Sequence, residues 1–220
     1  MKSQKLSVLA FLLSVATAYA APASQATPPS TALTSGTSHN ESGMPPMKGS
    51  DMESMHMTSS PNAAKAPTDL QFIDTMSMHH RMAIDMAELA RSRAEHAELK
   101  AMATKMVGDQ QKDTAQLKDW REQWYAGKPV ALNMKMPGMP ESMKGMSMQK
   151  LAAANGAEFD RMFVEMMSRH HAGAIKMSEA AAPMLQHAEV KAFAKKVLIS
   201  QKEELAQMKD WKKNWSEAKR

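Results

Sequence analysis

Cysteine is absent from the sequence, which excludes both a disulfide framework and metal binding by thiolates. Long apolar runs are also missing, because the run over residues 6–18 is too short to span a bilayer comfortably. Charge of one sign is not in large excess: 28 basic and 23 acidic residues give a formal net charge of +5 at pH 7. No cluster of Lys and Arg is interleaved with aromatic residues, so the composition does not indicate a nucleic-acid-binding protein.

The N-terminus has the pattern of an export signal. Lys2 and Lys5 precede the short apolar run, and the tripeptide Ala18-Tyr19-Ala20 fits a signal-peptidase site. We expect residues 1–20 to be a signal peptide that is removed. The mature protein is then periplasmic or secreted, with no membrane insertion after cleavage.

Methionine is strongly over-represented, with 24 residues in a chain of 220. A thiol is easily oxidised outside the cytoplasm, whereas a thioether remains available as a soft metal ligand. Two tracts concentrate these residues and are weaker metal candidates. The first lies in the tail over residues 21–67, which is rich in Ser, Thr and Pro and is expected to be disordered, and contains Met44, Met47, Met52, Met55, His56 and Met57. The second lies in a linker over residues 130–150 and contains Met134, Met136, Met139, Met143, Met146 and Met148. The alternative for both tracts is low-complexity linker.

The chain contains an internal repeat. Residues 72–124 align with residues 163–215 without a gap, and 24 of the 53 aligned positions are identical. Each repeat reads as one helical hairpin, with helices expected over 68–93 and 97–125 in the first half and over 157–182 and 188–216 in the second. Thr68 and Gln71 fit a capping box at the first helix. Because a single hairpin cannot cover its own apolar stripe, we expect an all-α fold, an antiparallel four-helix bundle over residues 68–216.

A stripe of apolar residues along the first helix of each hairpin carries a His-His pair. Its members follow steps of four and three residues, the spacing of one helix face. In the first half these are Phe72, Met76, His79, Ala83, Met86 and Ala90, and in the second Phe163, Met167, His170, Ala174, Met177 and Ala181. His80 and His171 complete the pairs. A single buried His is more often a hydrogen-bonded core residue, but four at matching levels, each pair flanked by Met, favour metal ligation.

The metal candidates are therefore two imidazoles and two thioethers in each half. They are Met76, His79, His80, Met86, Met167, His170, His171 and Met177. For the methionines, core packing is an equally good interpretation. Gln110 and Gln201 are expected opposite the second His of each pair, where an amide oxygen would orient the imidazole, or else they are ordinary exposed helix residues. Glu88 and Glu179 are weaker candidates for that role.

The donor set favours a soft metal. In di-iron helical proteins a Glu lies three residues before the His, whereas here that position holds Met76 or Met167. With imidazole and thioether ligands, no Cys and no inward carboxylate found in the sequence, the chain is expected to bind copper as Cu(I), with Ag(I) as its mimic.

These residues resemble the family named domain of unknown function 305. The resemblance covers about residues 69–216 and includes Phe163, Met167, the His170-His171-Ala172-Gly173 motif and Met177. It implies a ferritin-like four-helix fold, export to the periplasm and, as in some members, copper binding through Met/His sites with a role in copper resistance. The first half departs from the motif by having Met82 where the second has Gly173, so the halves need not bind metal equally.

We therefore expect an exported protein, without a substrate, that sequesters or transfers Cu(I). Its partners would be the metal ion and a copper-delivery or efflux protein. Two alternatives remain. The first is a cuprous oxidase that uses the same site, although it needs an open coordination position and harder ligands. The second is a helical bundle that binds haem noncovalently through His and Met, because no Cys-x-x-Cys-His motif is present.

Overall fold

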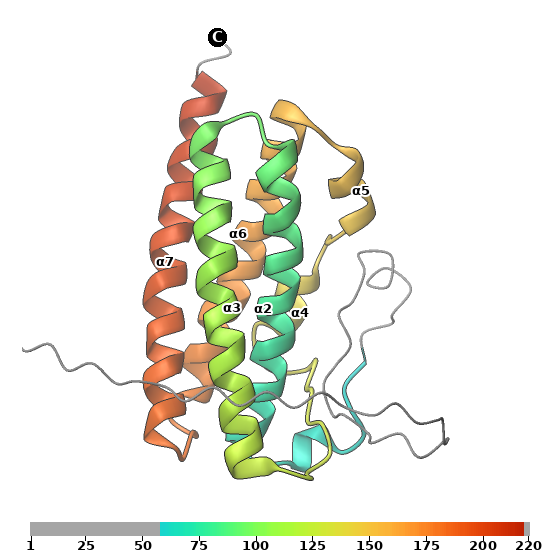
Figure 1. Cartoon of the computed structure of the whole chain (residues 1–220), viewed down its shortest axis with the longest axis vertical. Helices are drawn as coiled ribbons and strands as arrows, with labels where there is room; N and C mark the ends of the chain where they lie inside the picture. The colour runs from blue at the N-terminus through green and yellow to red at the C-terminus, as the bar shows by residue number, and fades with distance from the viewer. Residues whose placement is uncertain (1–57, 218–220) are drawn as a thin grey trace, which may run out of the picture. The chain divides into compact units, whose positions relative to one another are not determined.

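The structure is a computed structural model that describes residues 58–217. These residues are helical, with no strand among them, which confirms the all-helical prediction. Four long helices lie side by side (Figure 1): α2 (Thr68–Arg93), α3 (Ala97–Tyr125), α6 (Gly156–Ala181) and α7 (Ala188–Glu217). Three short elements accompany them: η1 (Ala63–Lys65), α4 (Met139–Met143) and α5 (Met148–Ala153). The expected signal peptide and most of the tail lie outside the described residues.

The long helices have bounds close to those expected, but the predicted capping box is wrong. Pro67 is the N-cap of α2, and no side chain caps that end. Thr68 is the first residue inside the helix, so its hydroxyl is not in the N-cap position. The Gln71 side chain instead donates a hydrogen bond to the Ala66 carbonyl at 2.7 Å.

The two hairpins cap each other. Asp160, near the start of α6, accepts hydrogen bonds from the backbone N–H groups of Glu95 and His96, at the start of α3. Its repeat equivalent, Asp69 in α2, accepts from Gln186 and His187 at the start of α7. A carboxylate satisfies the free amides of a helix N-terminus and interacts favourably with its dipole. Since each carboxylate belongs to the other hairpin, this exchange fixes the packing of one hairpin on the other.

Both helix starts also carry a His stacked on a Trp of the other hairpin. The His96 ring lies 4.0 Å from Trp215 at an interplanar angle of 15°, and His187 lies 3.9 Å from Trp124 at 12°. The His96 Nδ1 is 2.6 Å from the Asp160 carboxylate, whose side chain is almost completely buried. These two histidines are therefore structural residues at the ends of the helices.

The linker is folded onto the long helices. The backbone N–H of Ala131 donates to Asp74 at 2.7 Å, and that of Asn133 donates to Thr75 at 2.9 Å, both on α2. Residues 58–67, which the sequence analysis places in the tail, also contact it, since the Ser60 N–H donates to the Leu132 carbonyl at 2.8 Å. The short helix α4, not expected from the sequence, packs against α6.

The core consists of two apolar clusters stacked along the helices. Along α2 the first cluster ends at Met82 and the second begins at Ala83. Along α6 the order is reversed, with the second cluster ending at Met167 and the first resuming at Ala174. The two helices are therefore antiparallel neighbours, and their His pairs lie near the boundary between the clusters.

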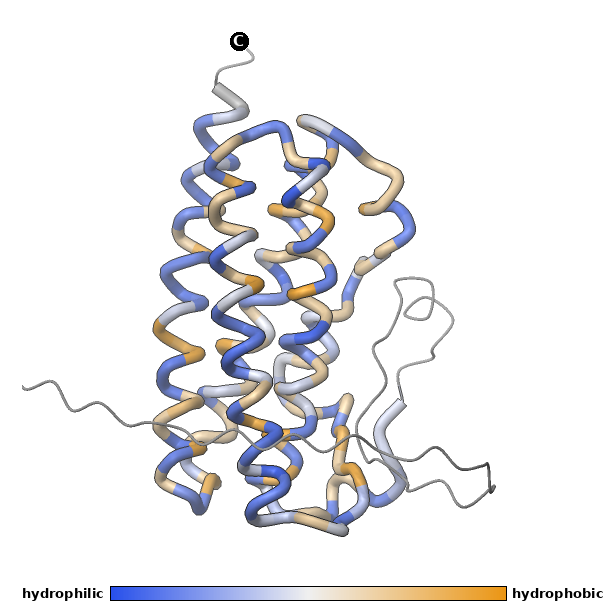
Figure 2. Tube along the Cα trace, in the orientation of Figure 1, coloured by the Kyte–Doolittle hydropathy of each residue, from blue (hydrophilic) through white to orange (hydrophobic). Residues whose placement is uncertain are grey.

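The long helices are amphipathic rather than uniformly apolar. Figure 2 shows hydrophilic residues recurring along each of them between the hydrophobic ones. None of the described helices is long and apolar enough to cross a membrane.

Gly173 allows α4 to lie directly on α6. A Cβ built on Gly173 would lie 1.7 Å from Ser142 Oγ and 2.5 Å from the Gly138 carbonyl oxygen. Gly138 has a φ of +93°, and a Cβ there would lie 2.0 Å from the Gly173 carbonyl oxygen. Both distances are shorter than any side chain tolerates. The crossing of α4 over α6 therefore requires glycine at both Gly138 and Gly173.

We predict that Gly173→Ala lowers the free energy of unfolding by about 1–3 kcal/mol, because the added methyl group displaces α4. Gly108→Ala is the matched control, since a Cβ at Gly108 on α3 meets nothing within 4 Å. It should raise stability by about 0.5–1 kcal/mol through the helix preference of alanine. Urea denaturation of both variants checks this, and equal effects would contradict the close crossing.

Candidate metal centre

Four histidines form one buried layer between the two apolar clusters. His79, His80, His170 and His171 are all at most 1% exposed. The rings of His79 and His170 are in contact, with centroids 3.6 Å apart and an interplanar angle of 32°. The centroids of His79 and His80 are 6.5 Å apart, and those of His170 and His171 are 6.3 Å apart. The closest imidazoles thus come from different hairpins, so the layer is shared between the repeats.

Ser142 of α4 orients the first imidazole. Its hydroxyl donates to the Gly138 carbonyl at 2.9 Å, in the usual backward bond of a helical Ser. The same oxygen lies 3.0 Å from His79 Nε2 and accepts the proton of that nitrogen. His79 therefore carries its proton on Nε2 and a free lone pair on Nδ1. Sequence analysis missed Ser142, which has no counterpart in the repeat.

Two carboxylates lie against the outer histidines, contrary to the expectation that none points inward. His171 Nε2 is 2.6 Å from Glu204 Oε2 on α7, and His80 Nε2 is 3.6 Å from Asp113 Oδ2 on α3. A carboxylate paired with imidazole Nε2–H leaves Nδ1 as the acceptor or ligand atom. Asp113 and Glu204 occupy equivalent positions of the repeat. Their different identities removed them from the count of identical positions.

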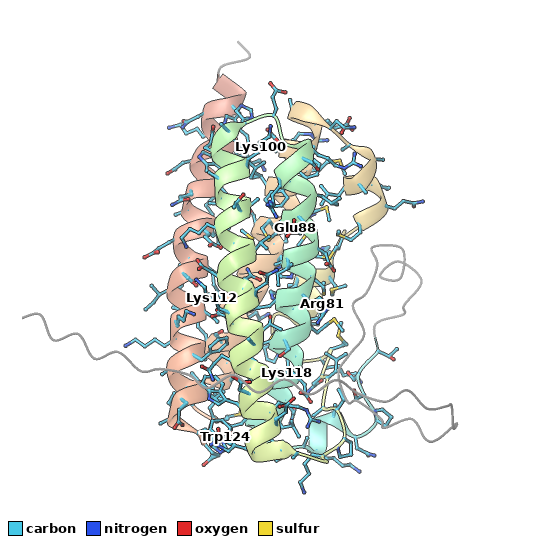
Figure 3. All side chains as sticks on the ribbon, in the orientation of Figure 1. Arg81, Glu88, Lys100, Lys112, Lys118 and Trp124 are labelled. Carbon is cyan, nitrogen blue, oxygen red and sulfur yellow. The ribbon has the colours of Figure 1, made fainter. Side chains whose placement is uncertain are left out.

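The predicted orienting amides are buried but do not hold the imidazoles. Gln110 and Gln201 are 5% and 3% exposed, and their Oε1 atoms have no hydrogen-bond partner in the described part of the chain. The carboxylates lie one helical turn further along the same faces. The weaker candidates are wrong, because Glu88 (Figure 3) and Glu179 are exposed and pair with Arg91 and Lys202.

The four methionines of the stripes are fully buried and divide into two pairs. Met76 and Met177 lie in the first apolar cluster, and Met86 and Met167 lie in the second. Because α2 and α6 are antiparallel, each pair takes one thioether from each repeat. The structure thus places a thioether pair on either side of the His layer.

The linker methionines also enter the core. Met136, Met139 and Met148 are buried within the two clusters, whereas Met134, Met143 and Met146 are partly buried and pack against them. This linker is therefore part of the helical unit and not a free metal-collecting tail. The tail candidates lie outside the described residues: Met44, Met47, Met52, Met55, His56 and Met57.

The layer holds several buried nitrogens without a hydrogen-bond partner. Among the described residues these are Nδ1 of His79, His80 and His171 and both ring nitrogens of His170. Leaving a buried polar atom unpaired costs roughly 1–3 kcal/mol. Five such atoms in one layer are a large deficit, of the kind that a bound ligand removes.

Burial keeps the central imidazoles neutral. It lowers the pKa of His79 well below the ordinary value of 6.5, and the charge of neighbouring His80 and His171 would lower it further. The pKa of His170 is lowered in the same way by burial and then by His79. Asp113 is different: burial would raise its pKa, but the interactions of its carboxylate with His80 and Lys196 bring the pKa below the ordinary value.

No group of three or more His, Asp or Glu side chains within residues 58–217 is arranged to hold a metal ion. Within the histidine layer, the close approaches between titratable side chains are the His79–His170 contact and the two His–carboxylate pairs.

Comparison with known proteins places the chain that carries this layer in a family. Residues 69–212 match the family described as domain of unknown function (DUF305). The chain belongs to the DUF305 family. The solved structure of CopM in the Cu(I)-bound form is 35% identical to it and covers 67% of this chain and 96% of that chain, with a TM-score of 0.57.

Further solved structures extend the comparison. CopM in an Ag-bound form gives the same values, 35% identity, 67% and 96% coverage and a TM-score of 0.57. A DUF305 protein from Streptomyces coelicolor, described as a candidate secreted protein, is 24% identical over 68% of this chain and 91% of that chain, with a TM-score of 0.58. That likeness supports the fold alone. No curated protein matches the chain.

We predict that the metal-free DUF305 chain loses stability as the pH falls below about 6.5. The unfolded chain binds protons at its histidines near pH 6.5, whereas the buried His79 and His170 resist protonation, so acid favours the unfolded state. Each unit by which a pKa is lowered corresponds to about 1.4 kcal/mol. Urea denaturation at about pH 7.5 and pH 5 measures the difference.

The double variant His79→Gln with His170→Gln should flatten this pH dependence, because glutamine does not titrate. The lowered pKa of Asp113 does not interfere, since its contribution is lost only below its ordinary value of 3.8. If the free energy of unfolding of the double variant depends on pH as strongly as that of the wild-type chain, the pH dependence does not come from His79 and His170.

Proposed function

We propose that this DUF305 protein binds Cu(I), and Ag(I) as its mimic, in the layer formed by His79, His80, His170 and His171. In this proposal the four long helices form an antiparallel, ferritin-like four-helix bundle whose two repeated hairpins share the site. Thioethers above and below the imidazoles complete the ligand set: Met76, Met86, Met167 and Met177. The protein sequesters the ion or hands it on, and has no substrate to transform.

The observation that carries the proposal is the set of unpaired, buried imidazole nitrogens. His79 and His171 present their Nδ1 lone pairs because Ser142 and Glu204 accept hydrogen bonds from the Nε2–H groups. A neutral imidazole is the form that binds metal, and burial keeps His79 and His170 in that form. Neutral nitrogen and thioether donors suit a soft, singly charged ion.

The relatives support the same ion. CopM, to which this chain is 35% identical, has been solved with Cu(I), with Cu(II) and with Ag bound. The expected signal peptide supports export to the periplasm or the medium. There the protein would contribute to copper resistance, receiving or passing copper through a delivery or efflux partner.

We predict that replacing both His79 and His170 by Ala weakens Cu(I) binding by at least about a hundredfold, because the layer loses its central donor pair. The measurement is anaerobic competition with a chromophoric Cu(I) chelator. His187→Gln is the matched control. This His lies at a helix end, stacked on Trp124, so its loss should reduce stability and leave affinity unchanged. Full affinity in the double variant would move the site elsewhere in the chain.

The carboxylates should act through the imidazoles. We predict that Glu204→Gln weakens Cu(I) binding by about ten- to a hundredfold, because the tautomer of His171 is no longer fixed. Glu203→Gln, at the exposed neighbouring position, removes the same charge without touching the layer and should have little effect. Equal losses in the two variants would indicate a general electrostatic effect.

A cuprous oxidase is the second candidate, favoured by the carboxylates of Asp113 and Glu204 beside the imidazoles. Harder oxygen donors stabilise Cu(II), the product of one-electron oxidation. The electron acceptor would be dioxygen. Oxygen consumption on addition of Cu(I), above that of free Cu(I) and lost in Asp113→Asn with Glu204→Gln, would establish this activity. Haem binding is less well supported, because the contact of His79 with His170 leaves no gap between the rings for a haem.

A further inference from the structure

A cleft on the outer face of the helices lies directly outside the histidine layer. It has a volume of about 470 Å³ and runs between α3 and α7. Lys112, labelled on α3 in Figure 3, is at its rim. Its other lining residues are Asp113, Gln116 and Trp120 of α3 and Glu189, Ala192, Phe193 and Lys196 of α7.

The floor of this cleft separates solvent from His80. Asp113 and Phe193 line the cleft, and both lie against the buried His80 ring. The Asp113 carboxylate is 3.6 Å from His80 Nε2, and the Phe193 ring centroid is 6.2 Å from that of His80. From His80 the imidazoles continue inward to His79, with ring centroids 6.5 Å apart. A single layer of side chains thus lies between the cleft and the buried donors.

An ion pair closes the floor. Lys196 Nζ is bonded to Asp113 Oδ1, while Oδ2 of the same carboxylate faces His80. The Lys196 side chain is 59% exposed and that of Asp113 only 11%. A Lys side chain that is more than half exposed can swing into solvent, because its rotamers interconvert rapidly. The buried carboxylate stays in place, so the lysine is the movable part.

We infer that the α3–α7 cleft is the port through which a monovalent metal ion reaches the layer, and that Lys196 is its gate. With the lysine bound, its ammonium repels an incoming cation. With the lysine released, the Asp113 carboxylate attracts the cation and lies next to the first imidazole, His80. The inference rests on the proposed metal site, and assigns to Lys196 and Asp113 control of the rate of loading.

The other repeat provides a matched set of controls. Lys105 is the repeat equivalent of Lys196, and Ala101 that of Ala192. Lys105 pairs with Asp109 at 2.7 Å and not with Glu204, the equivalent of Asp113. The ion pair between this lysine and the carboxylate beside the outer histidine is therefore formed at Asp113 and not at Glu204.

The test is stopped-flow loading of the full chain with Ag(I), followed by the fluorescence of Trp120 and the other tryptophans. Ala192→Phe narrows the cleft without touching a ligand and should slow association several-fold at unchanged affinity. Lys196→Gln should speed association and dissociation together by about fivefold, the effect expected for removing a unit charge about 4 Å from the path of the ion in water. Ala101→Phe and Lys105→Gln should leave the rates unchanged.

The outcomes separate the port from the site. If the wild-type chain takes up Ag(I) and Ala192→Phe and Lys196→Gln keep its rates, the port is wrong and the metal site stands. Rate changes in the Ala101 and Lys105 variants, in place of those at Ala192 and Lys196, also overturn the port. If Ag(I) binding is unaffected by loss of His79 and His170, the metal site itself is wrong.

Discussion

The contact between two neutral imidazoles, His79 and His170, is the constraint on which the rest of the structure depends. Placing two uncharged but polar rings in contact at the centre of four helices, tilted by 32° to each other, forfeits their hydration. The surrounding structure supports them unevenly. Ser142 satisfies one nitrogen of His79, whereas neither ring nitrogen of His170 makes a hydrogen bond of normal geometry within residues 58–217. An ordinary core would satisfy the nitrogens of both rings. The unsatisfied nitrogens of His170 therefore indicate a site for a ligand.

The crossed caps hold the pair together. His79 and His170 belong to different hairpins, so their contact requires the hairpins to dock in one register. Asp69 and Asp160 fix that register, because each carboxylate binds the free amides at the turn of the opposite hairpin. A change of register would leave two buried carboxylates and several amides unpaired. The fold and the proposed site are thus specified by the same exchange between the repeats.

Much of this arrangement could be predicted from the sequence, because it repeats. The steps of three and four residues identified the buried faces, and the repeat identified the two hairpins. What could not be predicted came from residues outside those patterns. Asp113 and Glu204 were missed because the repeat conserves their acidity and not their identity, and because helix spacing alone does not rank them above Gln110 and Gln201. Ser142 was missed because a linker position has no periodicity from which to infer its partner.

The linker also makes the two halves unequal. Gly173 admits α4 and Ser142 to the layer, and the first repeat has Met82 at that position, fully buried in the apolar cluster. Only one of the two inner histidines therefore acquires a hydroxyl partner. The ion pair of Lys196 with Asp113 is likewise not repeated by Lys105 and Glu204, because Lys105 pairs with Asp109. The two repeats therefore contribute unequal surroundings to the layer: Ser142 beside one inner histidine, and the exposed Lys196 outside one outer histidine.

The central claim is that imidazole and thioether together bind the metal ion. X-ray absorption at the copper K-edge of the reduced, copper-loaded protein tests it most directly, because nitrogen and sulfur neighbours give distinct scattering. The account predicts both imidazole nitrogen and thioether sulfur around Cu(I), with the nitrogen contribution reduced when His79 and His170 are replaced by Ala. A shell of sulfur alone in the wild-type protein, unchanged in that variant, would contradict it.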